Sequence, residues 1–316
     1  MIRPFALLLA ALGPLAGIEG AAPPAPASLS VEGPDGWREW WRADRAPSRW
    51  SASLPEVAAA VRWQPLPAGA RWGELRLSGE GEAWRIRAIL VELDPDEVLL
   101  ETVSLERPGS GPRRWNVDSA PSDAIAALNA GQFTSAGPWG WLVRDGVELR
   151  GPGTGPLAPA FVVDTAGAVR LVPPDSIVTL RGSPAVRQAF QSYPSLLVDE
   201  GRIPGPLREV GLGVDLEHRD ARLAVGIDRQ GRLLIAMTRF EGLGGALSNL
   251  PFGLTTPEMA ALMGALGCRR AMLLDGGISS QLRVRLPDGR TRVWRGIRQV
   301  PLGLVALPRS PGVLSP

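Results

Sequence analysis

A carboxylate at the end of an apolar run, Asp275, is the residue of this sequence best placed to do chemistry. The run before it, 271–274, is typical of a buried strand. Two glycines, Gly276 and Gly277, follow directly and let a ligand come close to the backbone. Many active sites are built on loops at strand ends, although Asp-Gly also favours an ordinary hairpin turn.

The residues before this strand predict a capped helix that positions it. Thr255, Pro257 and Glu258 form a helix-start pattern, with a hydroxyl cap, a proline in the first turn and Glu three residues after the cap. Gly267 marks the end of the helix. Apolar residues recur between them at helical spacing, at Met259, Leu262, Met263 and Leu266.

The whole stretch resembles the signature of the phosphodiester glycosidase family, in which a helix is followed by a sequence close to N-L-D-G-G-G-S-S/A. Here it reads LLDGGISS, with Ile278 in place of the usual third glycine. Gln132 and Leu223 also depart from the family pattern, where an aromatic residue and a threonine are usual. Four further segments are similar to family blocks and occur in the family's order: 127–133 (ALNAGQF), 191–201 (QSYPSLLVDEG), 221–226 (ARLAVG) and 253–256 (GLTT).

The resemblance implies a hydrolase that cleaves a sugar-1-phosphodiester and releases the sugar. Asp275 would act on the glycosidic bond as base, acid or nucleophile, with Asn129 as a further catalytic residue at the end of a predicted helix. Arg222 would clamp the phosphate, because a guanidinium matches two phosphate oxygens bidentately. The residues expected to bind substrate are Gly276, Gly277, Ser279, Ser280, Gln191 and His218.

Only one catalytic carboxylate is assigned, whereas ordinary glycosidases use two. A phosphate monoester leaves readily, which reduces the need for a strong general acid; Asp199 and Glu200 are candidates for a second carboxylate. One cysteine, Cys268, and one histidine are present, so no Cys/His metal cluster can form. We therefore expect no metal and no cofactor, with Arg222 supplying the positive charge.

Two other functions remain open. The departures from the family pattern would suit a non-catalytic exported module that binds a polysaccharide or helps to assemble an exopolysaccharide. The Trp-rich segment near residue 40 would suit a periplasmic interaction protein. An enzyme should bring Asn129, Arg222 and Asp275 together in one pocket, whereas a binding module should show a shallow aromatic groove away from Asp275.

Composition limits the partners. The 316 residues include 34 basic and 32 acidic side chains, and every basic one is arginine. No dense basic run occurs, so nucleic-acid binding is not expected. The hydrophobic fraction of 45% indicates a globular chain, and the expected partner is a phosphorylated glycan.

The first residues predict export to the periplasm or the medium. Arg3 precedes an apolar core at 5–12, and small residues at 20–22 offer a cleavage point. The apolar run is short for a membrane span, so none is expected after cleavage, and an uncleaved anchor is the alternative. The predicted organisation is a signal peptide (1–22), a Pro/Ala-rich linker with a Trp-rich segment (23–55), a phosphodiester glycosidase-like domain (56–309) and a disordered tail (310–316).

The pattern along the chain predicts an α+β fold: a single domain of antiparallel or mixed sheets with three or four interspersed helices. Repeated hairpin signals separate short apolar runs. Besides the helix after Thr255, helices are predicted around Trp37–Trp41, from Ser119 to Leu128, and from Ser183. Predicted strands lie at 72–77, 84–92, 98–104, 139–143, 147–150, 161–164, 168–172, 221–227, 232–238, 283–286, 291–294 and 300–307.

Overall fold

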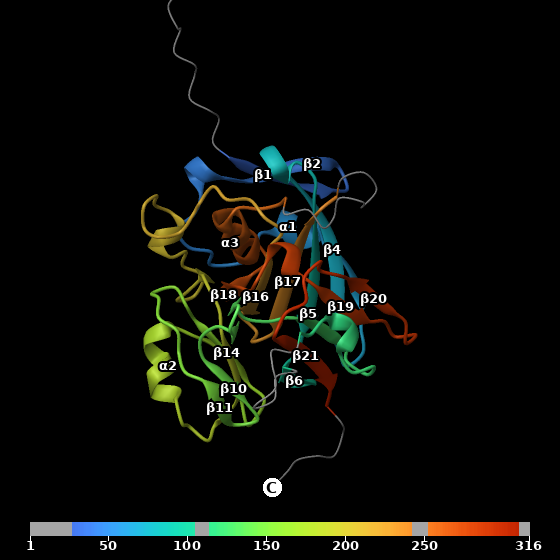
Figure 1. The fold of residues 1–316 in the computed structure, drawn as a ribbon. Helices are drawn as coiled ribbons and strands as arrows, with labels where there is room; N and C mark the ends of the chain where they lie inside the picture. Colours follow the sequence, from blue (N-terminus) through green and yellow to red (C-terminus); the bar gives the residue numbers. More distant parts are fainter. Residues whose placement is uncertain (1–26, 105–113, 242–251, 310–316) are drawn as a thin grey trace, which may run out of the picture.

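The computed structural model describes residues 27–104, 114–241 and 252–309, which form an α+β fold of packed antiparallel sheets (Figure 1). Every pair of named strands in this part of the chain runs antiparallel, so the α+β prediction is confirmed and the mixed-sheet option is not needed. The predicted signal peptide and tail lie outside the described residues. The single-domain organisation and the domain limits stay predictions.

The largest sheet has nine strands in the order β15-β18-β16-β17-β5-β4-β1-β2, and β3 pairs with β4 beside this path. Its strands are β1 (Ser28–Gly33), β2 (Gly36–Arg42), β3 (Arg62–Pro65), β4 (Arg71–Gly79), β5 (Ile86–Leu93), β15 (Ser195–Leu197), β16 (Leu223–Asp228), β17 (Leu233–Phe240) and β18 (Cys268–Leu273).

Two five-stranded sheets and a short hairpin complete the strands of the described residues. The first, in the order β11-β10-β14-β12-β13, contains β10 (Leu142–Arg144), β11 (Val147–Arg150), β12 (Ala160–Asp164), β13 (Val169–Val172) and β14 (Val186–Gln191). The second, in the order β20-β19-β7-β21-β6, contains β6 (Val98–Val103), β7 (Ala126–Asn129), β19 (Leu282–Arg285), β20 (Thr291–Trp294) and β21 (Gly303–Pro308). The hairpin pairs β8 (Phe133–Thr134) with β9 (Gly137–Pro138).

Successive side chains along the strands of the large sheet point to opposite faces, so they pack into two separate hydrophobic cores. On β5, Leu90 packs into the core beneath α1 (Pro55–Ala60) and α3 (Thr256–Ala265), while its neighbour Ile89 packs into the core shared with β7, β19 and β21. The remaining helix, α2 (Pro174–Leu180), packs Ile177 onto the sheet of β10 to β14. The central strands of the large sheet, β5, β16 and β17, are therefore buried on both faces.

The helix before Asp275 begins as predicted. Thr255 Oγ1 accepts a hydrogen bond from Glu258 N at 3.3 Å, and Glu258 Oε2 accepts one from Thr255 N at 2.9 Å. This reciprocal capping box satisfies two donors that would otherwise be unpaired. Helix α3 packs against β15 and β18, and thus supports the strand that ends at the predicted site.

The Trp-rich segment is a strand, so the predicted helix at Trp37–Trp41 is wrong. Residues 33–36 turn the chain, with Gly36 at a φ of 104°, and β2 then pairs back on β1. Trp41 packs into the core, Trp40 is half-buried and Trp37 is exposed. The turn signal Gly-Pro-Asp-Gly, which precedes the tryptophans, is what should have favoured a hairpin.

Two other predicted helices are also corrected. Residues 126–129 form β7 in the centre of its sheet, so Asn129 ends a strand and not a helix. A short apolar run that is buried on all sides does not distinguish strand from helix by its periodicity. Ser183-Pro184 is a turn leading into β14, and the helix of this region, α2, comes before it.

Candidate active site

The ends of two neighbouring strands create the site. β16 and β18 are antiparallel, with Ala224 opposite Leu273, so the residues before β16 lie beside those after β18. Leu274 N donates to Leu223 O at 2.8 Å and Gly277 N donates to Ala221 O at 2.7 Å, which extends this pairing past the strands. The segments 218–222 and 275–277 therefore lie side by side, where β16 begins and β18 ends.

A cleft of about 320 Å³ opens at these strand ends, and we name it the Asp275 cleft. Asp275, Gly276, Arg222 and His218, all predicted as site residues, line it. Its other polar lining residues are Gln132, Tyr193, Asp215, Asp220 and Thr256.

Asp275 is a partly buried carboxyl group with one fully buried oxygen. Its Oδ2 atom is buried and accepts no hydrogen bond from the described residues. Burial raises the pKa of Asp275 above its usual value, and the negative charge of Asp220 raises it further; a hydrogen bond from Ser279 and the charge of Arg298 lower it in part. A buried carboxyl group with a raised pKa is a typical proton donor or acceptor.

Asp220 is a second carboxylate in the same cleft. Its Oδ2 atom lies 3.8 Å from His218 Nε2, and its Oδ1 atom accepts a hydrogen bond from Ala221 N at 2.8 Å. Burial raises the pKa of Asp220, while the charge of Arg222 lowers it in part. The sequence reasoning missed Asp220, although it lies two residues before Arg222 in a segment already singled out; Asp199 and Glu200 instead form surface ion pairs with arginines.

The two glycines after Asp275 make room for this pair of carboxylates. A Cβ atom on Gly277 would lie 2.7 Å from Asp220 Oδ2, and one on Gly276 would lie 2.7 Å from Ala221 O. Gly277 also has a φ of 57°, which other residues adopt at a cost. A side chain at Gly276 would displace the backbone at Ala221, and one at Gly277 would displace the carboxylate of Asp220.

Arg222 brings a positive charge to the cleft and is fixed at two points. Its Nε atom donates to Leu254 O at 2.8 Å and its Nη2 atom donates to His218 O at 2.5 Å. The structure gives its Nη1 atom no hydrogen-bond partner among the described residues. Burial lowers the pKa of Arg222, although the charges of Asp220, Glu258 and Asp215 raise it in part, and an arginine stays charged at working pH.

Asn129 and Gln191 lie behind the cleft and support its wall. Asn129 Nδ2 donates to Asp275 O at 2.7 Å and Asn129 Oδ1 accepts from Gln281 N at 3.0 Å, so its amide fastens the Asp275 turn to β7. Gln191 Oε1 accepts from Trp141 N and its Nε2 donates to Ala158 O. Neither residue lines the Asp275 cleft, and both amides are committed to the protein backbone.

The remaining predicted site residues lie near Asp275 but differ in how far their side chains are exposed to solvent. Ser279 and Ser280 are buried, and the side chain of Ser279 hydrogen-bonds Asp275. His218 is exposed on a loop that Asp215 shapes by accepting hydrogen bonds from Glu217 N and His218 N, both at 3.0 Å. The loop thus holds the imidazole at the mouth of the cleft.

The three departures from the family pattern fall in different places. Ile278 is 43% exposed and Leu223 is buried in the core, and neither lines the cleft. Gln132 does line it, and its Nε2 atom donates to Tyr193 O at 3.2 Å. The altered cleft wall is therefore confined to one polar residue, which is hydrogen-bonded to the backbone of Tyr193.

A second arginine, Arg298, contributes positive charge near Asp275. Arg298 acts on Asp275 electrostatically and lies over the Phe133 ring at 4.8 Å, and no motif in the sequence had singled it out. Within residues 27–104, 114–241 and 252–309, no three His, Cys, Asp or Glu side chains form a group able to hold a metal ion. None of the helices in these same ranges combines the length and the apolar character needed to cross a bilayer.

Comparison with known proteins supports the fold described above. The phosphodiester glycosidase family matches residues 122–306. The fold is similar to that of the zebrafish N-acetylglucosamine-1-phosphodiester alpha-N-acetylglucosaminidase catalytic domain auto-inhibited by its pro-peptide, with 16% identity over 82% of this chain and 87% of that one and a TM-score of 0.58. It is also similar to a hypothetical protein from Synechocystis, with 16% identity over 90% of this chain and 69% of that one and a TM-score of 0.54. No curated protein matches the sequence.

Proposed function

The chain belongs to the phosphodiester glycosidase family, and on that premise we propose that it hydrolyses the bond between a sugar and a phosphodiester in the Asp275 cleft. The observation that supports this most is the pair of partly buried carboxylates, Asp275 and Asp220, which line one cleft with the guanidinium of Arg222. Most glycosidases use two carboxyl groups for catalysis, and a guanidinium group binds the oxygens of a phosphate through paired hydrogen bonds.

The charge of Asp220 raises the pKa of Asp275 beyond the effect of burial. Asp275 therefore stays protonated to a higher pH than an ordinary aspartate. One of them, ionised, attacks the anomeric carbon or activates water, while the other donates its proton to the departing phosphate oxygen. Arg222 neutralises the charge that grows on the phosphate, and the Tyr193 ring offers a face for the sugar.

The direct test is release of free sugar from a panel of sugar-1-phosphodiesters by the purified protein. Turnover should follow a bell-shaped pH profile, and Asp220→Asn should remove one limb of it with a loss of at least roughly tenfold. Asp199→Asn, an exposed carboxylate outside the cleft, is the matched control and should behave as wild type. Activity should survive EDTA treatment and dialysis. No release from any member of the panel would refute the proposal.

Export is a separate part of the proposal. It is supported by the charged start, the apolar core and the small residues of the first 22 positions. We expect a mature N-terminus between residues 21 and 23, found by N-terminal sequencing of protein recovered outside the cytoplasm. Recovery of Met1 on a cytoplasmic protein would contradict it.

A further inference from the structure

Two exposed tryptophans mark a second region of the same sheet, away from Asp275. Trp37 on β2 is 53% exposed and Trp84, just before β5, is 51% exposed. They are the only aromatic residues among the large exposed apolar side chains of the described residues. Both line one pocket of about 350 Å³, which we name the rim groove. Exposed indoles that share a pocket present apolar ring faces to a ligand.

The floor of the rim groove is charged and ordered. Arg76 on β4 contacts Glu32 at 3.1 Å and Glu241 at 3.3 Å, and all three line the pocket. Planar guanidinium and carboxylate groups held in this way can donate to and accept from neighbouring hydroxyl groups. The groove therefore contains hydrogen-bond donors and acceptors as well as two exposed indole rings.

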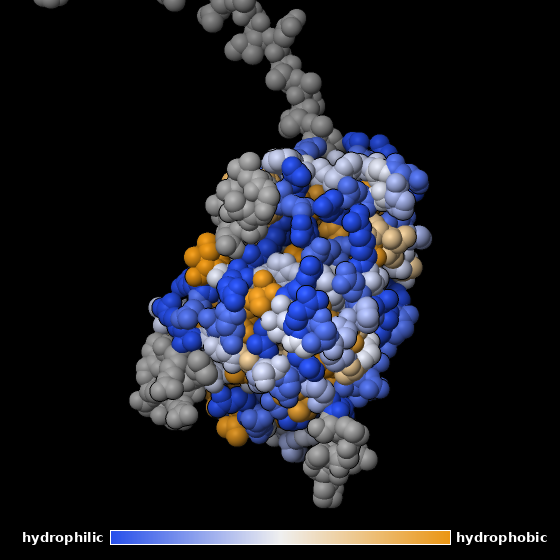
Figure 2. Space-filling view, turned by 90° about the vertical axis from the view of Figure 1, so that its right-hand side faces the viewer, coloured by the Kyte–Doolittle hydropathy of each residue, from blue (hydrophilic) through white to orange (hydrophobic). Residues whose placement is uncertain are grey.

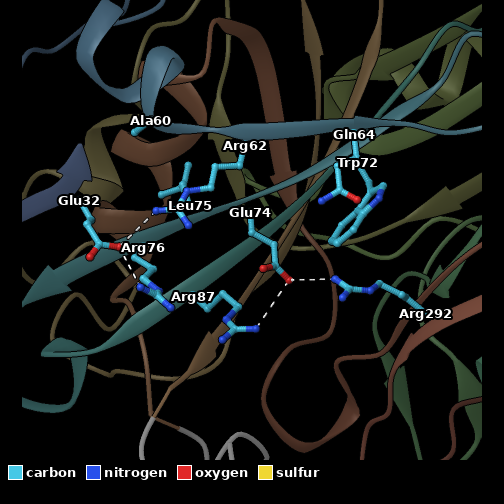
Figure 3. A pocket seen from close by; sticks show the side chains of 10 residues that line it. All are labelled: Glu32, Ala60, Arg62, Gln64, Trp72, Glu74, Leu75, Arg76, Arg87 and Arg292. Atoms are coloured by element: carbon cyan, nitrogen blue, oxygen red, sulfur yellow. Dashed lines mark hydrogen bonds and ion pairs between the residues drawn. The ribbon is translucent and has the colours of Figure 1, made fainter. Parts of the chain in front are cut away.

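The ion-pair network continues into an adjoining pocket of about 240 Å³ that shares Glu32 and Arg76 (Figure 3). There Glu74 lies 3.7 Å from Arg87 and 3.9 Å from Arg292, as the dashed lines of Figure 3 show. Figure 2 looks onto the side of the molecule on which β20 lies in Figure 1, and shows a mostly hydrophilic surface with small apolar spots. A polar floor of this kind favours a hydroxyl-rich ligand over an apolar one.

The tryptophans are held in place by the protein. The Trp84 ring packs edge-on against Phe240 at 5.4 Å, and the guanidinium of Arg85 lies 5.5 Å from the Trp84 ring. Trp37 lies opposite Glu32 in the β1–β2 hairpin, which fixes its place beside the charged floor. A ring that is already ordered loses little conformational entropy when a ligand stacks on it.

We propose that the rim groove is a carbohydrate-binding site that holds a glycan by stacking sugar rings on Trp37 and Trp84 over the Arg76 floor. A lipid surface is disfavoured because Glu32 and Glu241 would be brought against it. The site goes beyond the proposed hydrolysis, since it needs no turnover. β16 and β2 are five strand positions apart in the sheet, roughly 24 Å at about 4.8 Å per step, so a glycan that reached both sites would be several sugars long.

The test is binding of fluorescently labelled protein to an array of microbial and animal oligosaccharides. An Asp275→Asn background prevents cleavage in the cleft during the assay. At least one glycan class should bind, and Trp37→Ala should lower that binding about tenfold or more. Trp37→Tyr, which keeps an aromatic face, should retain most of it. Val178→Ala, a truncation of an exposed side chain on α2, is the control and should change nothing.

Two further measurements separate this site from the catalytic one. Trp37→Ala should hydrolyse a small soluble sugar-1-phosphodiester at the wild-type rate. Glycan binding without any turnover would keep the rim groove and refute the hydrolase. The rim groove is refuted if no glycan binds, if binding is indifferent to both Trp37→Ala and Trp84→Ala, or if Trp37 is needed only for binding to phosphatidylglycerol vesicles.

Discussion

The Asp275 cleft and the rim groove are built on different strands of the same large sheet, and the carboxylates in the two regions have opposite environments. In the cleft, Asp275 has a buried oxygen that accepts no hydrogen bond from the described residues, and burial raises its pKa. In the rim groove Glu32 contacts two arginines, and in the adjoining pocket Glu74 does the same. Buried charge with few partners destabilises the folded state but is suited to proton transfer, whereas paired charge at a surface is suited to holding shape and meeting ligands.

The comparison is tested most strongly by Asp275→Asn, which keeps the shape and removes the ionisable group. If Asp275 takes part in bond cleavage, turnover of a sugar-1-phosphodiester should fall by at least roughly a hundredfold. Substrate binding, measured by calorimetry, should persist because the cleft keeps its lining. Wild-type turnover in this variant would remove Asp275 from the mechanism.

The next effect concerns Arg222→Lys, which keeps a positive charge and loses the guanidinium fork. Hydrolysis of phosphodiesters should fall about tenfold or more, and hydrolysis of uncharged aryl glycosides should fall less, because only the former present phosphate oxygens to the fork. Equal losses on both substrates would mean that Arg222 acts by holding Leu254 and His218 in place.

The third effect is on stability and also uses Asp275→Asn. A carboxyl group with a raised folded-state pKa favours folding in its protonated form, so its ionisation weakens the fold as the pH rises through that pKa. The variant should therefore have a Tm at least about 2 °C above wild type at pH 7. The difference should shrink as the pH approaches the unfolded-state pKa of about 3.9, which thermal melts at several pH values can measure. A lower Tm at pH 7 would show that burial does not strain this group.

The smallest effect is in the pocket that adjoins the rim groove, where Glu74→Gln makes the same chemical change on a paired carboxylate. Glu74 is partly exposed and lies 3.7 Å from Arg87 and 3.9 Å from Arg292. The free energy of unfolding should fall by no more than about 1 kcal/mol at pH 7, opposite in sign to the cleft variant. Denaturant titration of the two variants side by side measures both signs. A stabilising Glu74→Gln would remove the contrast between the two regions.

Local signals in the sequence were enough for several features. The capping box at Thr255, the strand before Asp275 and most hairpins depend on neighbouring residues, and the structure contains them. The Asp275 turn could be singled out because its glycines are needed at positions that a side chain would block. Where an apolar run was short, as at 126–129, periodicity did not separate strand from helix, and burial within a sheet decided.

The remaining features of the site depend on the pairing of strands that are far apart in the sequence. Asp220 became a site residue only because β16 and β18 are neighbours, which brings its segment beside Asp275 across a gap of more than fifty positions. Asn129 and Gln191 carry polar amides that sequence reasoning assigned to catalysis and to substrate, whereas the fold uses them to fasten backbone segments. Residue types and short spacings determine which groups can do chemistry, but strand pairing determines which groups meet and which are exposed, since it joins segments that local interactions do not relate.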